Sequence, residues 1–193
     1  PPLPQAPAIE PGAQPPAPGT SGGGGAAHAA TSQAKQGVLL IGDSLTVGVK
    51  PFMPKDIDGA PVTVDATGGI PLKEGMRRYD AVKDKPRVVE MALFTNNSPG
   101  QIDELRSAIE KTVKDARERG GRVVWATIVR PGDYGAVNSM IRDMAAKNSD
   151  VMGLVDWARM VKDKPSLVGG DGVHSGPDGY KLRAQAFVDA AKA

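Results

Sequence analysis

Cysteine is absent from this sequence of 193 residues, which excludes disulfide bridges and metal sites built on thiolates. Histidine is scarce, and the two that occur are His28 and His174. No apolar run approaches the roughly 20 residues that a membrane-spanning helix needs, so no span is predicted in this chain. The net charge is only +2, with basic residues interleaved among acidic ones, so nucleic acid is not a predicted partner.

Residues 1–36 differ in composition from the rest of the chain. They contain eight prolines, six glycines and nine alanines, whereas Glu10 and Lys35 are their only charged residues. Such a segment buries too little apolar surface to offset the entropy lost on ordering. We therefore predict that residues 1–36 form a disordered linker and that residues 37–193 form one folded domain. Because the sequence lacks a start methionine and a signal peptide, we expect a fragment or a processed product.

Strand and helix signals alternate along the predicted domain. The segments predicted as strands are 38–41, 61–66, 87–94, 122–129 and 151–157. The segments predicted as helices are 101–119, 136–147 and 177–191. Apolar strands that alternate with helices indicate a parallel sheet covered on both faces. We therefore predict an α/β fold, a three-layer α/β/α sandwich around a central parallel sheet of about five strands.

Unusual residues follow four of the predicted strands, where the chain leaves the sheet. They are Ser44, the pair Gly68 and Gly69, the pair Asn96 and Asn97, and Arg130. In parallel sheets, ligands bind at the carboxyl ends of the strands. We therefore expect these residues to share one site.

The letters GDSL around Ser44 and DGVH ending at His174 supply the parts of an activated hydroxyl nucleophile. In such a site Ser44 attacks, His174 takes the proton, and Asp171 orients the imidazole. Because His28 lies in the low-complexity segment, His174 is the candidate base. Each residue also has a structural interpretation: Ser44 as a helix N-cap, His174 as a loop residue bonded to backbone, and Asp171 as a turn residue. Their combination favours catalysis.

Two further residues are candidates for oxyanion binding. The side-chain amide of Asn96 and the backbone N–H of Gly69 would stabilise negative charge that develops beside Ser44. The alternatives are a turn asparagine and a turn glycine with positive φ. Asp43 is predicted to fix its turn by local hydrogen bonds, and Arg130 to hold a substrate carboxylate or else to be a solvated loop residue. We predict no metal, because no His and carboxylate cluster has ligand spacing, and no cofactor.

The two motifs resemble the SGNH hydrolase superfamily, also called GDSL esterases and lipases, over residues 37–193. The residues that match the family's four blocks, in order, are Ser44, Gly69 (or Gly68), Asn96, and Asp171 with His174. The resemblance implies the three-layer fold and a serine nucleophile. It also implies an oxyanion hole formed by the backbone N–H groups of Ser44 and Gly69 and the side chain of Asn96.

One position departs from the family pattern. The third block usually has the form Gly-x-Asn, whereas this chain has Phe94 in place of the glycine, two residues before Asn96. A phenyl ring at this position is expected to narrow the substrate pocket or to shift Asn96. We therefore assign Phe94, together with Arg130, to the wall of the pocket.

A narrower resemblance rests on the phrases VTVDATGG, VEMALFTNN and DGVHSGPDGY. They are similar to the extracytoplasmic SGNH domains fused to membrane acyltransferases, such as peptidoglycan and surface-polysaccharide O-acyltransferases. This implies an extracytoplasmic O-acyltransferase of the O-acetyltransferase type, tethered through residues 1–36, with an acyl donor and a glycan acceptor as partners. The alternatives are a secreted GDSL-type carboxylesterase and, because of Phe94, a catalytically weak glycan-binding or scaffolding module.

Overall fold

The computed structural model describes residues 35–193, and the predicted linker lies almost wholly outside them. The strands of the described part are β1 (Lys35–Gly42), β2 (Asp56–Ile57), β3 (Ala60–Ala66), β4 (Pro86–Ala92), β5 (Arg122–Ala126) and β6 (Met152–Val155). The α-helices are α1 (Ser44–Val49), α2 (Leu72–Ala81), α3 (Ile102–Glu118), α4 (Gly135–Lys147), α5 (Trp157–Asp163) and α6 (Pro177–Lys192). None of the helices between Lys35 and Ala193 is both long and apolar enough to span a bilayer.

The strands form one sheet in the order β2-β3-β1-β4-β5-β6. Strands β3, β1, β4, β5 and β6 run parallel, and the two-residue strand β2 pairs antiparallel with β3. Strand β1 lies near the middle, with Leu40 opposite Val64 of β3 and Glu90 of β4. The predicted central parallel sheet of about five strands is confirmed.

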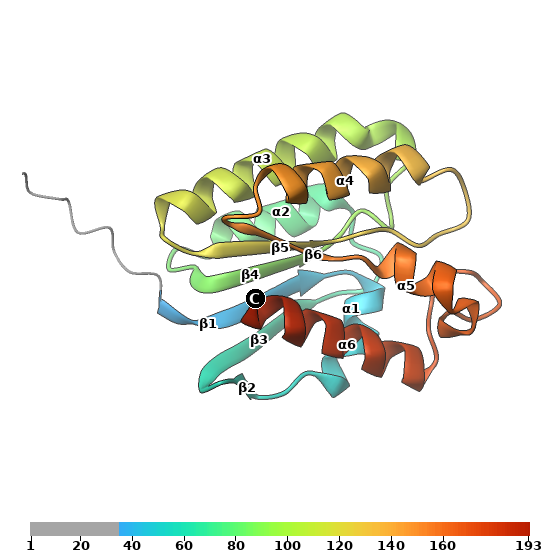
Figure 1. The fold of residues 1–193 in the computed structure, drawn as a ribbon, viewed down its shortest axis with the longest axis horizontal. Coiled ribbons are helices and arrows are strands. Elements are labelled where there is room, and N and C mark those ends of the chain that lie inside the picture. Colours follow the sequence, from blue (N-terminus) through green and yellow to red (C-terminus); the bar gives the residue numbers. More distant parts are fainter. Residues whose placement is uncertain (1–34) are drawn as a thin grey trace, which may run out of the picture.

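Helices cover both faces of this sheet (Figure 1). Helices α2, α3 and α4 lie on one face, and α1, α5 and α6 lie on the other. Alternate residues of β4 enter the two cores: Val89 packs in the cluster that contains α3, and Val88 packs in the cluster that contains α6. This burial on both faces explains why the central strands are mostly apolar. The predicted three-layer sandwich is therefore confirmed.

Some predicted boundaries were wrong. The strand predicted at 151–157 ends at Val155, because Asp156 caps α5 and Trp157 is already helical. The strands predicted at 87–94 and 122–129 end at Ala92 and Ala126. Helices α2 and α5 and the short strand β2 were not predicted.

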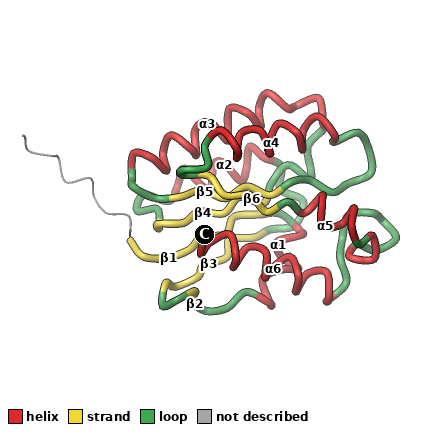
Figure 2. The backbone as a smooth tube through the Cα atoms, in the orientation of Figure 1, coloured by secondary structure: helices red, strands yellow, loops and turns green. Residues whose placement is uncertain are grey.

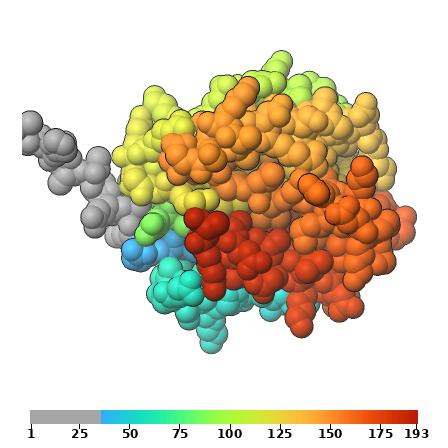
Figure 3. Space-filling model, in the orientation of Figure 1, coloured from blue at the N-terminus to red at the C-terminus, as the bar shows by residue number. Residues whose placement is uncertain are grey.

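The parallel strands place all their carboxyl ends at the same edge of the sheet. The loops that follow them gather on the right in Figure 2. The C-terminal part of the chain, orange to red in Figure 3, forms much of the visible lower surface, so α6 and the segment before it lie on the outside of the molecule. The residues singled out from the sequence lie in these loops.

Candidate active site

Ser44 lies at the turn from β1 into α1. The carboxylate of Asp43 is fully buried, and its Oδ1 accepts the N–H of Leu45 at 3.0 Å, which caps the helix. Ser44 is therefore the first residue of α1 and not its N-cap, so the alternative interpretation of Ser44 was wrong. The local hydrogen bonding predicted for Asp43 is confirmed. The turn is tight, since a Cβ on Gly42 would lie 1.9 Å from Oγ1 of Thr46.

The loop before α6 places Asp171 and His174 side by side. Oδ1 of Asp171 accepts the backbone N–H groups of Val173 at 2.9 Å and of His174 at 3.0 Å. The backbone N–H of Gly169 donates to the carbonyl of His174 at 2.6 Å. These bonds fix the loop, so that Oδ2 of Asp171 lies 2.7 Å from Nδ1 of His174.

The two loops meet at Ser44 and His174, which are 130 positions apart in the sequence. Oγ of Ser44 lies 2.9 Å from Nε2 of His174, so hydroxyl, imidazole and carboxylate form one continuous hydrogen-bonded series. The hydrogen bond to His174 is the main cause that lowers the pKa of Asp171 to about 2, so this carboxylate is ionised at neutral pH. The side chains of His174 and Asp171 are 49% and 53% exposed, which leaves the series open to a substrate.

Asn96 and Asn97 follow β4 in a loop beside the start of α2. The Asn96 amide donates one N–H to the carbonyl of Ile70 at 3.0 Å, and an amide nitrogen carries a second N–H. Asn97 is buried, and its Oδ1 accepts the N–H of Leu72 at 2.8 Å. Asn97 therefore fixes the loop, whereas Asn96 has a further donor for a ligand.

Phe94 does not lie where the sequence analysis expected it. Its ring is completely buried in the core between the sheet and α3, so it does not line a substrate pocket. Its backbone has a φ of +89°, in the region that favours glycine and is costly for a bulky residue. The chain thus keeps a glycine-like turn at Phe94 while the ring points into the core. The expected narrowing of the pocket by this ring was wrong.

Gly68 and Gly69 follow β3 in an exposed turn. Gly69 has a φ of +76°, as its interpretation as a turn glycine predicts. A Cβ built on Gly68 would lie 3.9 Å from the Cβ of Ser44, whereas one built on Gly69 would have no atom within 4 Å. The structure therefore brings Gly68 close to Ser44 and places Gly69 one residue further along the turn.

Arg130 is exposed, but it is not a freely solvated loop residue. Its guanidinium Nη1 donates a hydrogen bond to the carbonyl of Thr95, next to Asn96. The hydroxyl of Tyr134, four residues further on, donates to the carbonyl of Asn97 at 2.6 Å. The loop between β5 and α4 therefore stabilises, through these two hydrogen bonds, the loop that carries Asn96.

The sequence analysis missed Arg183 on α6, which is 2% exposed. Its guanidinium carbon lies 5.1 Å from the centre of the Trp157 ring and 5.7 Å from that of Phe187. Burial lowers the pKa of Arg183 to about 10, and the charge of Asp43 opposes this shift. Burial likewise raises the pKa of Asp43, and Arg183 opposes that shift more than any other group does. The sequence signal was available, because Arg183 stands on the buried face of α6 between Tyr180 and Phe187.

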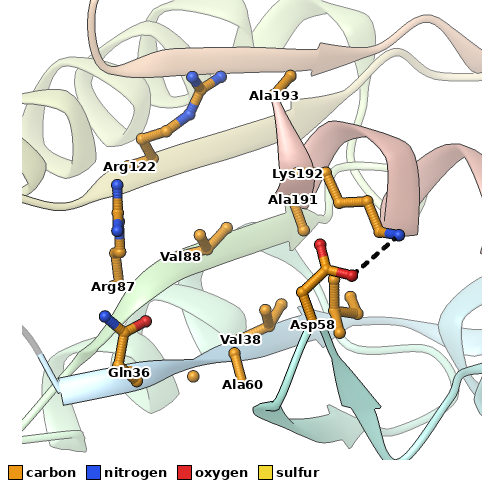
Figure 4. Close-up of a pocket in the computed structure, with 12 residues that line it drawn as sticks. Gln36, Val38, Asp58, Ala60, Arg87, Val88, Arg122, Ala191, Lys192 and Ala193 are labelled. Atoms are coloured by element: carbon orange, nitrogen blue, oxygen red, sulfur yellow. Dashed lines mark ion pairs between the residues drawn. The ribbon is translucent and has the colours of Figure 1, made fainter.

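A pocket of about 220 Å³ lies at the opposite edge of the sheet, between the starts of β1, β4 and β5 and the end of α6 (Figure 4). Asp58 and Lys192 form an ion pair of 3.3 Å beside it, and Arg87 and Arg122 line it. Neither a serine nor a histidine lines it. The carboxyl ends of α3 and α6 face this edge, and their partial negative charge suits the cations. No cluster of metal-ligating side chains occurs in residues 35–193.

Comparisons with known proteins match this chain by its fold but not by its sequence. No protein-family sequence model matches the chain, and no curated protein matches its sequence. Solved structures do match. The C-terminal catalytic domain of the Streptococcus pneumoniae peptidoglycan O-acetyltransferase OatA, seen with a methylsulfonyl adduct, is 21% identical, with a TM-score of 0.61 over 82% of this chain and 94% of that domain.

Two further structures have the same TM-score of 0.61. A candidate SGNH hydrolase from Slackia heliotrinireducens is 18% identical over 81% of this chain and 98% of its own. A GDSL-like lipase from Bacteroides thetaiotaomicron is 16% identical over 81% of this chain and 88% of its own. The protein therefore has the fold of the SGNH and GDSL hydrolases.

Proposed function

We propose that this protein is a serine-dependent acyl-ester enzyme, an O-acyltransferase of the O-acetyltransferase type that acts on a cell-envelope glycan. One observation carries the proposal: the continuous hydrogen bonds from the hydroxyl of Ser44 through His174 to Asp171. The fold supports it, because its structural neighbours include an O-acetyltransferase domain and a lipase, both of which act on acyl esters.

In the first half-reaction, Oγ of Ser44 attacks the carbonyl carbon of the acyl donor while its proton passes to Nε2 of His174. Asp171 accepts the Nδ1–H of the ring, which holds the reactive tautomer and stabilises the imidazolium. Collapse of the tetrahedral intermediate breaks the bond to the donor's oxygen. That oxygen takes the proton from His174 and leaves, so that an acyl ester remains on Ser44.

The negative charge of the tetrahedral intermediate needs hydrogen-bond donors. The backbone N–H of Ser44 is one candidate, since it belongs to the first turn of α1 and has no partner within the helix. The second N–H of the Asn96 side chain is another, and the turn of Gly68 and Gly69 supplies a third. We assign the third donor to the backbone N–H of Gly69. The N–H of Gly68 is the alternative, because Gly68 lies nearer to Ser44.

In the second half-reaction, a hydroxyl of the acceptor gives its proton to His174 and attacks the acyl ester. Ser44 leaves and recovers the proton, and the acyl group is now on the acceptor. Water can take the acceptor's place, because the side chain of His174 is half exposed. This exposure favours carboxylester hydrolysis as the second candidate function. The two functions share every step up to the acyl-enzyme.

We further propose that the domain works outside the cytoplasm and is tethered to a membrane acyltransferase that supplies the acyl group. Two observations support this arrangement. The sequence phrases resemble such fused domains, and the OatA structure is likewise a C-terminal catalytic domain. The acceptor is then a glycan on the outer side of the membrane.

The nucleophile is tested by hydrolysis of 4-nitrophenyl acetate. We expect Ser44→Ala to abolish the hydrolysis that the wild-type protein shows, and Ser139→Ala, at an exposed serine of α4, to leave it unchanged. Equal hydrolysis by Ser44→Ala and the wild type would contradict the proposal. Adding an oligosaccharide acceptor then separates the two functions: acylated sugar supports transfer, and acetate alone supports hydrolysis.

A further inference from the structure

An open hollow of about 300 Å³ lies between the loop after β5, the start of α4 and helix α5. Its lining includes the apolar side chains of Ile128, Val129 and Val161, together with Tyr134. Its charged lining residues are Arg130 and Lys162, and no carboxylate lines it. The hollow is thus an apolar surface flanked by two cations.

The hollow adjoins the candidate active site through the loop after β5. Arg130 donates to the carbonyl of Thr95, the residue before Asn96. A Cβ built on Gly172, which lies between Asp171 and His174, would be 3.3 Å from Cγ of Pro131. The loop that carries Arg130 therefore lies against both the loop of Asn96 and the loop of His174, so the hollow and the candidate active site share this loop.

Neither cation of the hollow forms an ion pair with the acidic residues around it. Two of the acidic side chains of α5 and the adjoining loops are paired with other cations, Asp156 with Arg142 and Asp163 with Arg159, while Asp133 accepts the backbone N–H of Gly135 and keeps its charge. In residues 35–193, neither Arg130 nor Lys162 is within ion-pair distance of a carboxylate. Two cations without ion-pair partners, beside an apolar surface, are suited to an oxyanion carried on a sugar.

We propose that this hollow is a subsite for an anionic group, a carboxylate or a phosphate, on the acceptor glycan. This inference rests on the proposed acyl transfer and names its substrate class: an acidic rather than a neutral polysaccharide. Arg130 contributes planar N–H donors, and Lys162 contributes a mobile point charge. The partly exposed side chains of Val129 and Val161 contact the apolar face of the sugar ring. The subsite holds the acceptor so that a neighbouring hydroxyl reaches the acyl group on Ser44.

Binding is measured on the full chain carrying Ser44→Ala, so that no acyl chemistry interferes. The probes are trigalacturonate, a phosphorylated galactotriose and neutral galactotriose, titrated by calorimetry at low ionic strength. We expect at least one anionic probe to bind roughly tenfold more tightly than galactotriose, and added salt to reduce that difference. The tighter of the two anionic probes identifies the group as carboxylate or phosphate.

Charge reversal at Lys162 tests the hollow itself, since this exposed side chain forms no ion pair that its loss would break. We expect Lys162→Glu to weaken binding of the anionic probe about tenfold or more and to leave galactotriose unaffected. Lys147→Glu, at the far end of α4, makes the same change of net charge at another exposed lysine that forms no ion pair within residues 35–193, and it should have no effect. Equal weakening by both variants, or anionic probes that bind no more tightly than galactotriose, would overturn the subsite. Hydrolysis of 4-nitrophenyl acetate that persists in Ser44→Ala would contradict the proposed function alone, so the two failures are distinguishable.

Discussion

The ring of Tyr180 on α6 packs directly against Gly48 on α1. A Cβ at Gly48 would lie 2.2 Å from Cζ of this ring, so a larger residue fits only if the ring or one of the two helices moves. Helix α1 begins at Ser44, and α6 follows the loop of His174. The contact between Gly48 and Tyr180 therefore sets the distance between the proposed nucleophile and its base.

We predict that Gly48→Ala separates the two helices. Overpacking of this kind typically costs about 1–3 kcal/mol of stability, and a displacement near 1 Å lowers turnover by roughly 10². Urea unfolding and 4-nitrophenyl acetate hydrolysis measure the two effects. Adding Tyr180→Ala to Gly48→Ala should restore part of the turnover, because it removes the clashing ring. Wild-type turnover in Gly48→Ala alone would show that the contact does not position the site.

At Phe94 we predict that a glycine substitution destabilises the protein less than an alanine substitution, the reverse of the usual order. Both Phe94→Ala and Phe94→Gly lose the buried ring and should be less stable than the wild type, by about 3–5 kcal/mol for the alanine variant. The positive φ at this position favours glycine, so Phe94→Gly should be the more stable variant by about 1 kcal/mol. Denaturant unfolding of the two variants measures this difference. A more stable alanine variant would show that the positive φ at Phe94 is not strained.

The adjacent residues Asn96 and Asn97 should separate catalysis from stability. Asn96→Ala removes a proposed oxyanion donor and should lower turnover by roughly 10²–10³, with a small loss of stability from its bond to Ile70. Asn97→Ala leaves the buried N–H of Leu72 without a partner and should cost about 1–3 kcal/mol of stability. Turnover and unfolding are measured on both variants. A reversed pattern would mean that the oxyanion role belongs to Asn97.

Glu90 lies in the middle of the sheet, completely buried, between Leu40 of β1 and Val124 of β5. Neither carboxyl oxygen has a hydrogen-bond partner among the described residues. Burial raises the pKa of Glu90 well above its ordinary value of 4.5. Its carboxyl group is thus protonated in the folded chain at pH values where the unfolded chain has already lost that proton.

The sign of the resulting pH dependence follows from these two pKa values. Below 4.5 both states hold the proton, so Glu90 contributes no pH dependence. As the pH rises above 4.5, only the unfolded state releases the Glu90 proton. The free energy of unfolding therefore falls by up to about 1.4 kcal/mol per pH unit. Glu90→Gln does not titrate, so its stability relative to the wild type should increase with pH between 4.5 and neutrality. Urea unfolding at several pH values measures this, and a constant difference would contradict the buried neutral acid.

The sheet was predictable because its central strands are buried on both faces and are therefore mostly apolar. Helix α3 was predictable from its apolar stripe and from Gly120 and Gly121, which end it. Helix α2 was missed although its buried residues Leu72, Gly75 and Tyr79 recur at helical spacing, because glycine is a poor helix former and obscures the pattern. The end of β6 was misjudged because an apolar run that crosses a helix cap looks continuous, although Asp156 marked the cap.

In the candidate site, the sequence identified the residues but not their contacts. The spacing of Asp171 and His174 within one loop predicted their proximity, whereas the approach of Ser44 depends on the packing of α1 on α6. The direction of the Phe94 ring depends on the positive φ of this residue, which cannot be read from the composition or periodicity of the sequence. The brace from Arg130 to Thr95 joins two loops far apart in the sequence, so only the fold could reveal it.

The central claim is that Ser44 becomes acylated. The most direct measurement is the intact mass of the protein, acid-quenched shortly after mixing with 4-nitrophenyl acetate and followed by peptide mapping. The account predicts that the wild-type chain gains the mass of one acetyl group on the peptide that contains Ser44, and that Ser44→Ala gains none. Equal acetylation of both proteins, or an acetyl group mapped to another residue, would contradict it.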